Sequence, residues 1–297
     1  MLERTARLTI KENHMSDAEH RWERIRNGLL WIVIPLILGG LLSSALIPQP
    51  VVGVIRLEDA IYSYSAQNMI KQIQYAIDAP EVHAVVLVFD SPGGTVVDTE
   101  AVYMELTRLR EKKPVVTAIN AMAASGAYYL SVNTDYIYAK PTSLVGNIGV
   151  IGYLPPAPFV VEDIITTGPY KLWGAPRDSD MRQVEMVKQG FFEAVKIGRE
   201  GKLTAGDEVV FSGQIWAGTD AVRLGIADAI GTERDAAEKA AELAKIANYK
   251  VLDLAGPAGI ATGGSFFFIQ SPDGMMNLPY PNEAGIFLLY IPPLPVK

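Results

Sequence analysis

Apolar and polar positions alternate after Val51 in the pattern of an α/β domain. Short runs rich in β-branched residues, typical of strands, are separated by longer amphipathic runs with helical spacing. This order predicts βαβ units and a mostly parallel sheet. The predicted strands cover residues 51–57, 84–89, 114–119, 136–139 and 148–154. The predicted helices cover residues 65–77, 96–110, 124–132, 179–200, 217–224 and 235–246.

Glycine and proline mark the places where this pattern should break. Residues 90–94 (DSPGG) predict a turn that a strand cannot continue through, and residues 141–147 predict a loop. Residues 251–297 are rich in glycine and proline and predict an extended tail. The tail contains two strand-sized or interfacial apolar pieces, 266–269 and 285–291, which are too short to cross a membrane.

A single uncharged apolar run, residues 29–47, precedes the α/β pattern. A helix of this length is about 28 Å long, close to the hydrocarbon thickness of a bilayer. Basic residues are much more frequent before the run than directly after it, which places the N-terminus in the cytoplasm. We therefore expect a cytoplasmic leader (1–28), a transmembrane anchor (29–47) and a domain on the extracytoplasmic side of the cell membrane. A buried core helix and a signal peptide cleaved near residues 43–45 are the alternatives.

Composition narrows the chemistry that this domain can perform. A net charge of −7 disfavours nucleic-acid binding, which depends on clustered Lys and Arg. The absence of cysteine excludes disulfides, thiolate metal sites and a cysteine nucleophile. Of three histidines, only His83 follows the apolar run, and it opens a predicted strand at the amino end of the sheet. A Ser-His-Asp triad and a multi-histidine metal site are therefore disfavoured.

The residues that remain still permit a serine nucleophile activated by a lysine. Ser125 follows a predicted strand and opens a predicted helix, with small neighbours that leave it open to approach. The glycines at 93 and 94 follow the preceding strand, where main-chain N–H groups could bind an acyl oxygen. A lysine base must be neutral, and lowering its pKa to about 7.5 requires roughly 4 kcal/mol. A tightly packed helix start and a plain turn are the alternative interpretations of these motifs.

Five segments together resemble the SppA-type signal peptide peptidases, which are membrane-anchored serine peptidases of the ClpP/crotonase fold. The segments are 89–103, 115–131, 138–152, 166–171 and 216–243. They occur in order between about residue 50 and residue 245. The resemblance implies a ClpP/crotonase-like peptidase domain over residues 48–250, with layered sheet and helices.

The resemblance also assigns roles to residues. It implies that Ser125 is the nucleophile, Lys171 the general base, and the main-chain N–H groups of Gly93, Gly94 and Gly126 the oxyanion donors.

Two positions qualify this assignment of roles. Lys140 is the rival base because it is closer to Ser125 in sequence. Asn147 stands where the family usually has a hydroxyl residue, and we expect its amide oxygen to orient the lysine instead.

The implied activity is cleavage of remnant signal peptides or other apolar peptides at the membrane, with no metal or organic cofactor. The lipid bilayer and the peptides are the expected partners. A homo-oligomeric ring, with eight copies as one form, is also implied. Three other functions remain open: an NfeD-type protease acting on a stomatin-like partner, an inactive peptide-binding scaffold, and an acyl-CoA enzyme of the crotonase fold.

Overall fold

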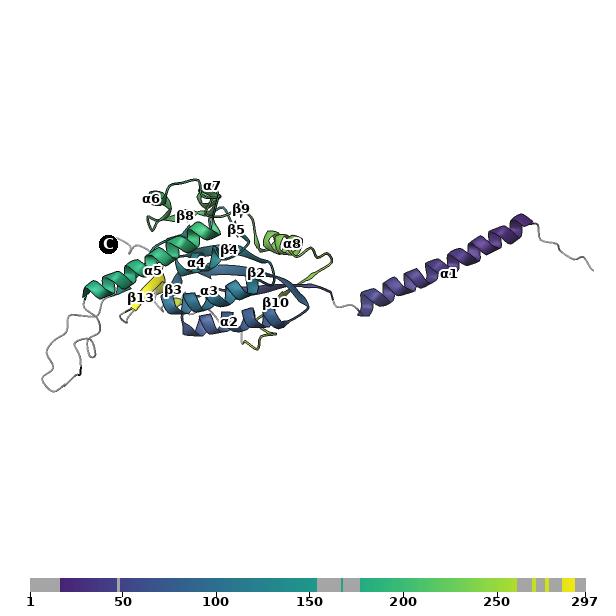
Figure 1. Cartoon of the computed structure of the whole chain (residues 1–297), viewed down its shortest axis with the longest axis horizontal. Helices are drawn as coiled ribbons and strands as arrows, with labels where there is room; N and C mark the ends of the chain where they lie inside the picture. Colours follow the sequence, from purple (N-terminus) through teal and green to yellow (C-terminus); the bar gives the residue numbers. More distant parts are fainter. Residues whose placement is uncertain are drawn as a thin grey trace, which may run out of the picture. The chain divides into compact units, whose positions relative to one another are not determined.

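The computed structural model describes residues 17–46, 49–153, 167, 177–260, 269–270, 276–277 and 285–291. The chain divides into two units, residues 1–48 and residues 49–297. Figure 1 shows the elements of both units.

The first unit contains one helix, α1 (Asp17–Leu46), with Pro35 inside it. The helix begins well before the apolar run 29–47. Within the described residues, no helix combines the length and the apolar character that crossing a membrane requires. The structure therefore does not support the transmembrane helix predicted for this run.

The second unit is built on a parallel-rich sheet. Its strands lie in the order β10 (Lys250–Asp253), β1 (Val51–Leu57), β2 (Val82–Ser91), β4 (Val115–Ala124), β5 (Tyr136–Ala139) and β9 (Ala229–Ile230). These neighbours all pair in parallel. The end of β4 also pairs in parallel with β6 (Leu144–Gly146), which pairs antiparallel with β8 (Ile215–Ala217). This mixed α/β architecture fits the ClpP-like domain that the sequence predicts.

Helices cover both faces of this sheet (Figure 1). One face packs against α2 (Ser63–Asp78), α3 (Val96–Arg110), α4 (Gly126–Ser131) and α5 (Arg177–Gly198) in the larger apolar cluster. The other face packs against alanines of α8 (Glu233–Leu243). Alternate residues of β2 supply the two faces, because successive strand side chains point in opposite directions. Leu87 and Phe89 face the larger cluster, whereas Val86 and Val88 face α8. The short helices α6 (Asp207–Val210) and α7 (Gly218–Arg223) complete the unit.

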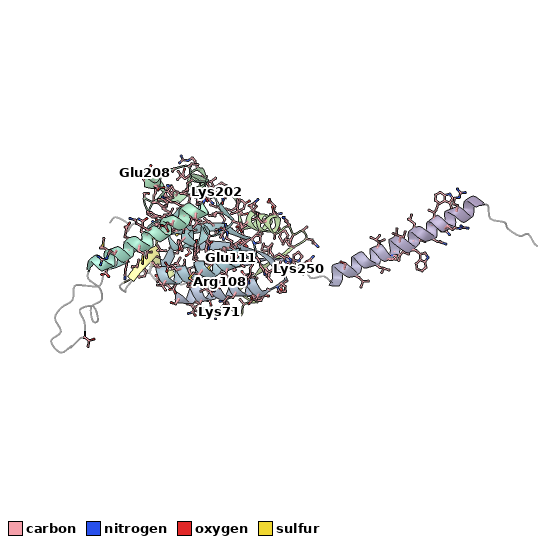
Figure 2. The ribbon with its side chains drawn as sticks, viewed as in Figure 1. Lys71, Arg108, Glu111, Lys202, Glu208 and Lys250 are labelled. Atoms are coloured by element: carbon pink, nitrogen blue, oxygen red, sulfur yellow. The ribbon has the colours of Figure 1, made fainter. Side chains whose placement is uncertain are left out.

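The helices that cover the sheet are amphipathic, as their spacing predicts. In α2, Met69 and Ile73 are buried, whereas Lys71 is exposed. In α3, Leu106 and Leu109 are buried, and the side chain of Arg108 projects outward (Figure 2). Burial of the apolar stripe, rather than intrinsic helix propensity, holds such helices in place.

A second, smaller sheet contains residues from three distant parts of the sequence. Strand β13 (Gly285–Leu289) pairs antiparallel with β3 (Gly93–Thr95) on one side and with β7 (Ile151–Tyr153) on the other. A separate pair joins β11 (Ile269–Gln270) and β12 (Met276–Asn277).

Most predicted elements are confirmed to within a few residues, but three predictions at the strand ends are wrong. The strand predicted to stop before Asp90 continues through Ser91, because the β2–β4 ladder resumes after a register shift, pairing Ser91 with Ala123. Strand β4 extends to Ala124 because its end also pairs with β6, where Ala124 pairs with Gly146, and the following helix starts only at Gly126. Residues 144–146 form β6 within the predicted loop. Strand β10 was not predicted, and of residues 266–269 only Ile269 lies within the described residues.

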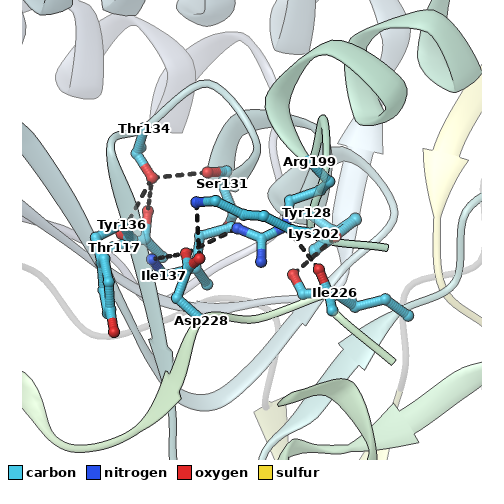
Figure 3. A network of polar contacts seen from close by, with 11 residues as sticks. Thr117, Tyr128, Ser131, Thr134, Tyr136, Ile137, Arg199, Lys202, Ile226 and Asp228 are labelled. Atoms are coloured by element: carbon cyan, nitrogen blue, oxygen red, sulfur yellow. Dashed lines mark hydrogen bonds and ion pairs between the residues drawn. The ribbon is translucent and has the colours of Figure 1, made fainter. Parts of the chain in front are cut away.

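A buried ion pair joins α5 to the strands behind it (Figure 3). The Arg199 guanidinium donates to Asp228 Oδ2 at 2.7 Å and to the Gly225 carbonyl at 2.8 Å. Asp228 also accepts from the Ile137 main-chain N–H at 2.8 Å and pairs with Lys202 at 2.7 Å. Burial by itself raises the pKa of Asp228, but the bonds from these cations and from Ile137 outweigh it and hold that pKa below its ordinary value.

Replacing Asp228 with Asn should lower the free energy of unfolding by about 3–5 kcal/mol at pH 7, because Arg199 would remain buried without a counter-charge. Urea unfolding of the full chain measures this change. Asp220→Asn is the control, since Asp220 and Arg223 form an exposed pair whose loss should cost at most about 1 kcal/mol. Equal losses in the two variants would contradict a structural role for the buried pair.

The lowered pKa of Asp228 also predicts how this stabilisation depends on pH. A carboxylate with a depressed folded-state pKa stabilises fully above its unfolded pKa of about 3.9 and loses that effect as pH falls through the folded value. The difference in unfolding free energy between wild type and Asp228→Asn should therefore be constant from about pH 6 to 8 and shrink below about pH 4. Urea unfolding across this range tests the sign, and a difference that grows in acid would refute it.

Candidate active site

Ser125 lies on a strained turn between β4 and α4. Its backbone angles are φ 52° and ψ −115°, in a region that residues other than glycine rarely adopt. Such strain costs about 1–3 kcal/mol and persists only where neighbouring contacts hold it. Here the Ser125 N–H donates to the Gly146 carbonyl and the Tyr129 N–H donates to the Ser125 carbonyl, both at 2.8 Å.

The hydroxyl of Ser125 is not used to cap the helix that follows it. Serine at this position commonly caps a helix, and that bond would compete with chemistry. A serine on a sharp strand-to-helix turn is the arrangement that exposes nucleophiles in many hydrolases. The turn therefore gives Ser125 the setting of a nucleophile.

Gly93 and Gly126, two of the three predicted oxyanion donors, lie side by side. A Cβ atom built on Gly93 would lie 2.6 Å from the Gly126 nitrogen, and one built on Gly126 would lie 3.4 Å from the Gly93 Cα. Gly93 has φ +92°, so a side chain there would be both strained and obstructed. Two main-chain segments thus meet beside the serine, where only glycine allows the approach.

Gly94, the third predicted donor, packs against a different segment. A Cβ atom on Gly94 would lie 1.9 Å from the Ile61 carbonyl oxygen, and the two residues form a β-bridge. The Gly93 carbonyl accepts from the Ile61 N–H at 2.8 Å. These contacts fix the Pro-Gly-Gly turn against the loop after β1.

Ser91 belongs to this turn, and sequence reasoning missed it. The side chain is fully buried, and its Oγ accepts from the Gly93 N–H at 3.3 Å. A buried serine two residues before a glycine with positive φ is the signal that could have identified it. The Gly93 N–H, a predicted oxyanion donor, is thus engaged by this hydroxyl and would have to leave it to bind an oxyanion.

Asn147 is connected to the serine turn through its neighbour, because Gly146 accepts the Ser125 N–H. Asn147 adopts φ 53°, and its amide nitrogen donates to the Gly213 carbonyl at 2.7 Å. Its own N–H donates to the Gln214 carbonyl at 2.8 Å. With the amide nitrogen held in this way, Oδ1 is the atom that can accept from a lysine ammonium.

The predicted base, Lys171, lies outside the described residues. Its rival Lys140 is half-buried at the end of β5, near the carboxylate of Asp90. Burial is the largest effect on Asp90 and raises its pKa; Glu58 raises it further, and Lys140 opposes the rise. Lys140 thus interacts electrostatically with the Asp90 carboxylate.

Other titratable side chains lie on the helix after the turn or at the amino ends of the strands. Burial raises the pKa of Tyr129 to about 12, and burial also raises the pKa of Tyr128, whose hydroxyl donates to the Ile226 carbonyl at 2.9 Å. Lys113 donates to the carbonyls of Ala76 and Ala79 at the end of α2. His83 is exposed at the start of β2, as predicted. In the described part of the chain, no group of three or more His, Asp or Glu side chains could hold a metal ion.

Comparison with known proteins identifies the family. Residues 107–247 match the family described as peptidase family S49, and residues 51–143 match the Clp protease family. The chain is 32% identical to Protease 4 of Salmonella typhi over 189 residues, which cover 59% of this chain and 30% of that protein.

Two further relatives are smaller proteins. A Methanocaldococcus jannaschii protein described as a protease is 32% identical over 186 residues, covering 58% of this chain and 60% of that protein. A Synechocystis sp. protein, also described as a protease, is 30% identical over 211 residues, covering 66% of this chain and 76% of that protein. The chain thus spans less than a third of Protease 4 and over half of the smaller relatives. From these matches, the chain belongs to peptidase family S49, the SppA-type peptidases.

Proposed function

We propose that the chain is a serine endopeptidase with a Ser125–Lys171 dyad that degrades remnant signal peptides or other apolar peptides. The observation that carries this proposal is the strained turn at Ser125, with the main chain of Gly93 and Gly126 meeting beside it. A nucleophile with main-chain N–H groups close to it supplies the parts that acyl transfer requires. Membership of a peptidase family supports a peptide as the acyl donor.

In the proposed reaction, the Ser125 Oγ attacks the peptide carbonyl carbon while a neutral Lys171 takes the hydroxyl proton. The N–H groups of Gly93 and Gly126 stabilise the oxyanion, and the lysine returns the proton to the leaving amine. Water then hydrolyses the acyl-serine. Asn147 Oδ1 orients the lysine amine, which explains how an amide can replace a hydroxyl at this position.

The proposed place of action is the cell membrane, with the catalytic domain on the extracytoplasmic side. It rests on the sequence, namely the apolar run 29–47 and the basic residues before it. Assembly into a homo-oligomeric ring likewise rests on the family resemblance.

The dyad is tested by cleavage of a synthetic signal peptide by the full chain in detergent. Ser125→Ala and Lys171→Ala should each lower kcat by about 1,000-fold or more, because nucleophile and base act as a unit. Lys140→Ala is the matched control and should stay within about threefold of wild type.

The same assay separates the alternatives. Loss of activity in Lys140→Ala with full activity in Lys171→Ala would transfer the role of base to Lys140. Tight peptide binding without cleavage by wild type would replace the enzyme by a peptide-binding scaffold.

Because the backbone at Ser125 is strained, we expect a glycine at this position to make the fold more stable. Ser125→Gly and Ser125→Ala should both be inactive, but the glycine variant should be about 1 kcal/mol more stable, because glycine adopts φ 52° at little cost. Urea unfolding of both full-length variants measures the difference. Equal stability would show that the turn is not strained.

A further inference from the structure

Two of the predicted oxyanion donors, Gly126 and Gly93, differ in what their N–H groups contact. Gly126 is the first residue of α4, and N–H groups in the first turn of a helix have no acceptor within that helix. The Gly93 N–H, in contrast, donates to the Ser91 Oγ at 3.3 Å. An acyl oxygen at this site would therefore compete with the Ser91 hydroxyl for one of these two donors.

The Ser91 hydroxyl is fixed in the interior by the sheet. Its residue has an exposed fraction of 0% and pairs with Ala123 of β4, two residues before the nucleophile. Gly93 is buried as well, and its carbonyl accepts from the Ile61 N–H. Removing one buried hydroxyl leaves little room for a water molecule, so the Gly93 N–H would lose its acceptor.

The bond from Gly93 to Ser91 is present although a neutral peptide carbonyl lies beside the turn. The Leu288 carbonyl oxygen would lie 2.0 Å from a Cβ atom built on Gly93 and 3.2 Å from one built on Gly126. With that oxygen close by, the Gly93 N–H still donates to the Ser91 Oγ. An ionised oxygen is a stronger competitor, because charge-assisted hydrogen bonds are about twice as strong as neutral ones.

We propose that Ser91 is a positioning residue that holds the Gly93 N–H until the transition state forms. The inference rests on the proposed function, since it concerns the same oxyanion site. In the free enzyme and in the substrate complex, the N–H donates to Ser91. When Ser125 attacks and the carbonyl oxygen becomes negative, the N–H donates to that oxygen instead. An interaction made only in the transition state raises kcat without tightening the binding of substrate.

Replacing Ser91 with Ala tests this role by separating KM from kcat. Without the hydroxyl, the substrate carbonyl accepts from the Gly93 N–H already in the bound complex. One neutral hydrogen bond corresponds to about a fivefold change in an equilibrium constant, so KM for a synthetic signal peptide should fall about fivefold. Because the bond to the oxyanion is the same in both enzymes, kcat should stay within about twofold of wild type. An unchanged or raised KM, or a lower kcat, would overturn the proposal.

Binding measured without cleavage checks the same step. In the inactive Ser125→Ala background of the full chain, adding Ser91→Ala should lower the Kd of the signal peptide about fivefold. A matched peptide, with the carbonyl at the wild-type cleavage site reduced to a methylene group, has no oxygen to accept the N–H. Its Kd should therefore not fall, and an equal fall for both peptides would overturn the proposal.

Two further variants control for effects on packing. Ser91→Cys keeps a similar side-chain shape but places a weak acceptor beside Gly93, so it should lower KM as Ser91→Ala does. Ser131→Ala removes another fully buried hydroxyl, which donates to the Ala127 carbonyl at 2.8 Å within α4. This control should keep KM and kcat within about twofold of wild type. A comparable fall in its KM would assign the effect to packing and overturn the role of Ser91.

The same measurements separate this inference from the proposed function. Ser125-dependent cleavage by wild type, with KM and Kd unchanged in the Ser91 variants, would overturn the role of Ser91 and leave the proposed function standing. Absence of Ser125-dependent cleavage by wild type would overturn both.

Discussion

Close approach of three main-chain segments at Gly93, Gly126 and Leu288 is the constraint on which the site depends. Gly93 must be glycine because its φ is +92° and a Cβ atom would lie 2.0 Å from the Leu288 carbonyl oxygen, and a Cβ atom on Gly126 would also be tightly packed. The approach brings the end of β2, the start of α4 and a strand nearly two hundred residues away to one place. A chemical site for a peptide bond exists here only because backbone packs directly on backbone.

The strained turn at Ser125 needs a rigid support, and the parallel sheet provides it. Strand β4 is buried in the centre of the sheet, and β6 holds the turn through the carbonyl of Gly146. The hydroxyl of Tyr128, a residue of α4, donates to the carbonyl of Ile226, two residues before Asp228. Asp228 is in turn paired with the buried Arg199. Figure 3 shows Tyr128 beside Ile226 and the Asp228–Arg199 pair, so the helix that follows the serine turn is joined to the segment of the ion pair.

Strand β13 covers two sheet edges beside the Ser125 turn, those of β3 and β7. Unpaired edges are hazardous because they attract other strands, and covering one protects the protein. The strand therefore protects the edges of β3 and β7 while it is in place.

The sequence by itself predicted the parallel sheet, most helices and the place of Ser125 between a strand and a helix, because these depend on local periodicity and on glycine-rich breaks within short stretches. It also predicted a strand-sized piece at residues 285–291, but not its place. Only the tertiary structure decided that β13 lies between β3 and β7, that Gly93 meets Gly126, and that Arg199 meets Asp228. These contacts join residues far apart in the chain, and no local pattern encodes which distant edge a strand will pair with.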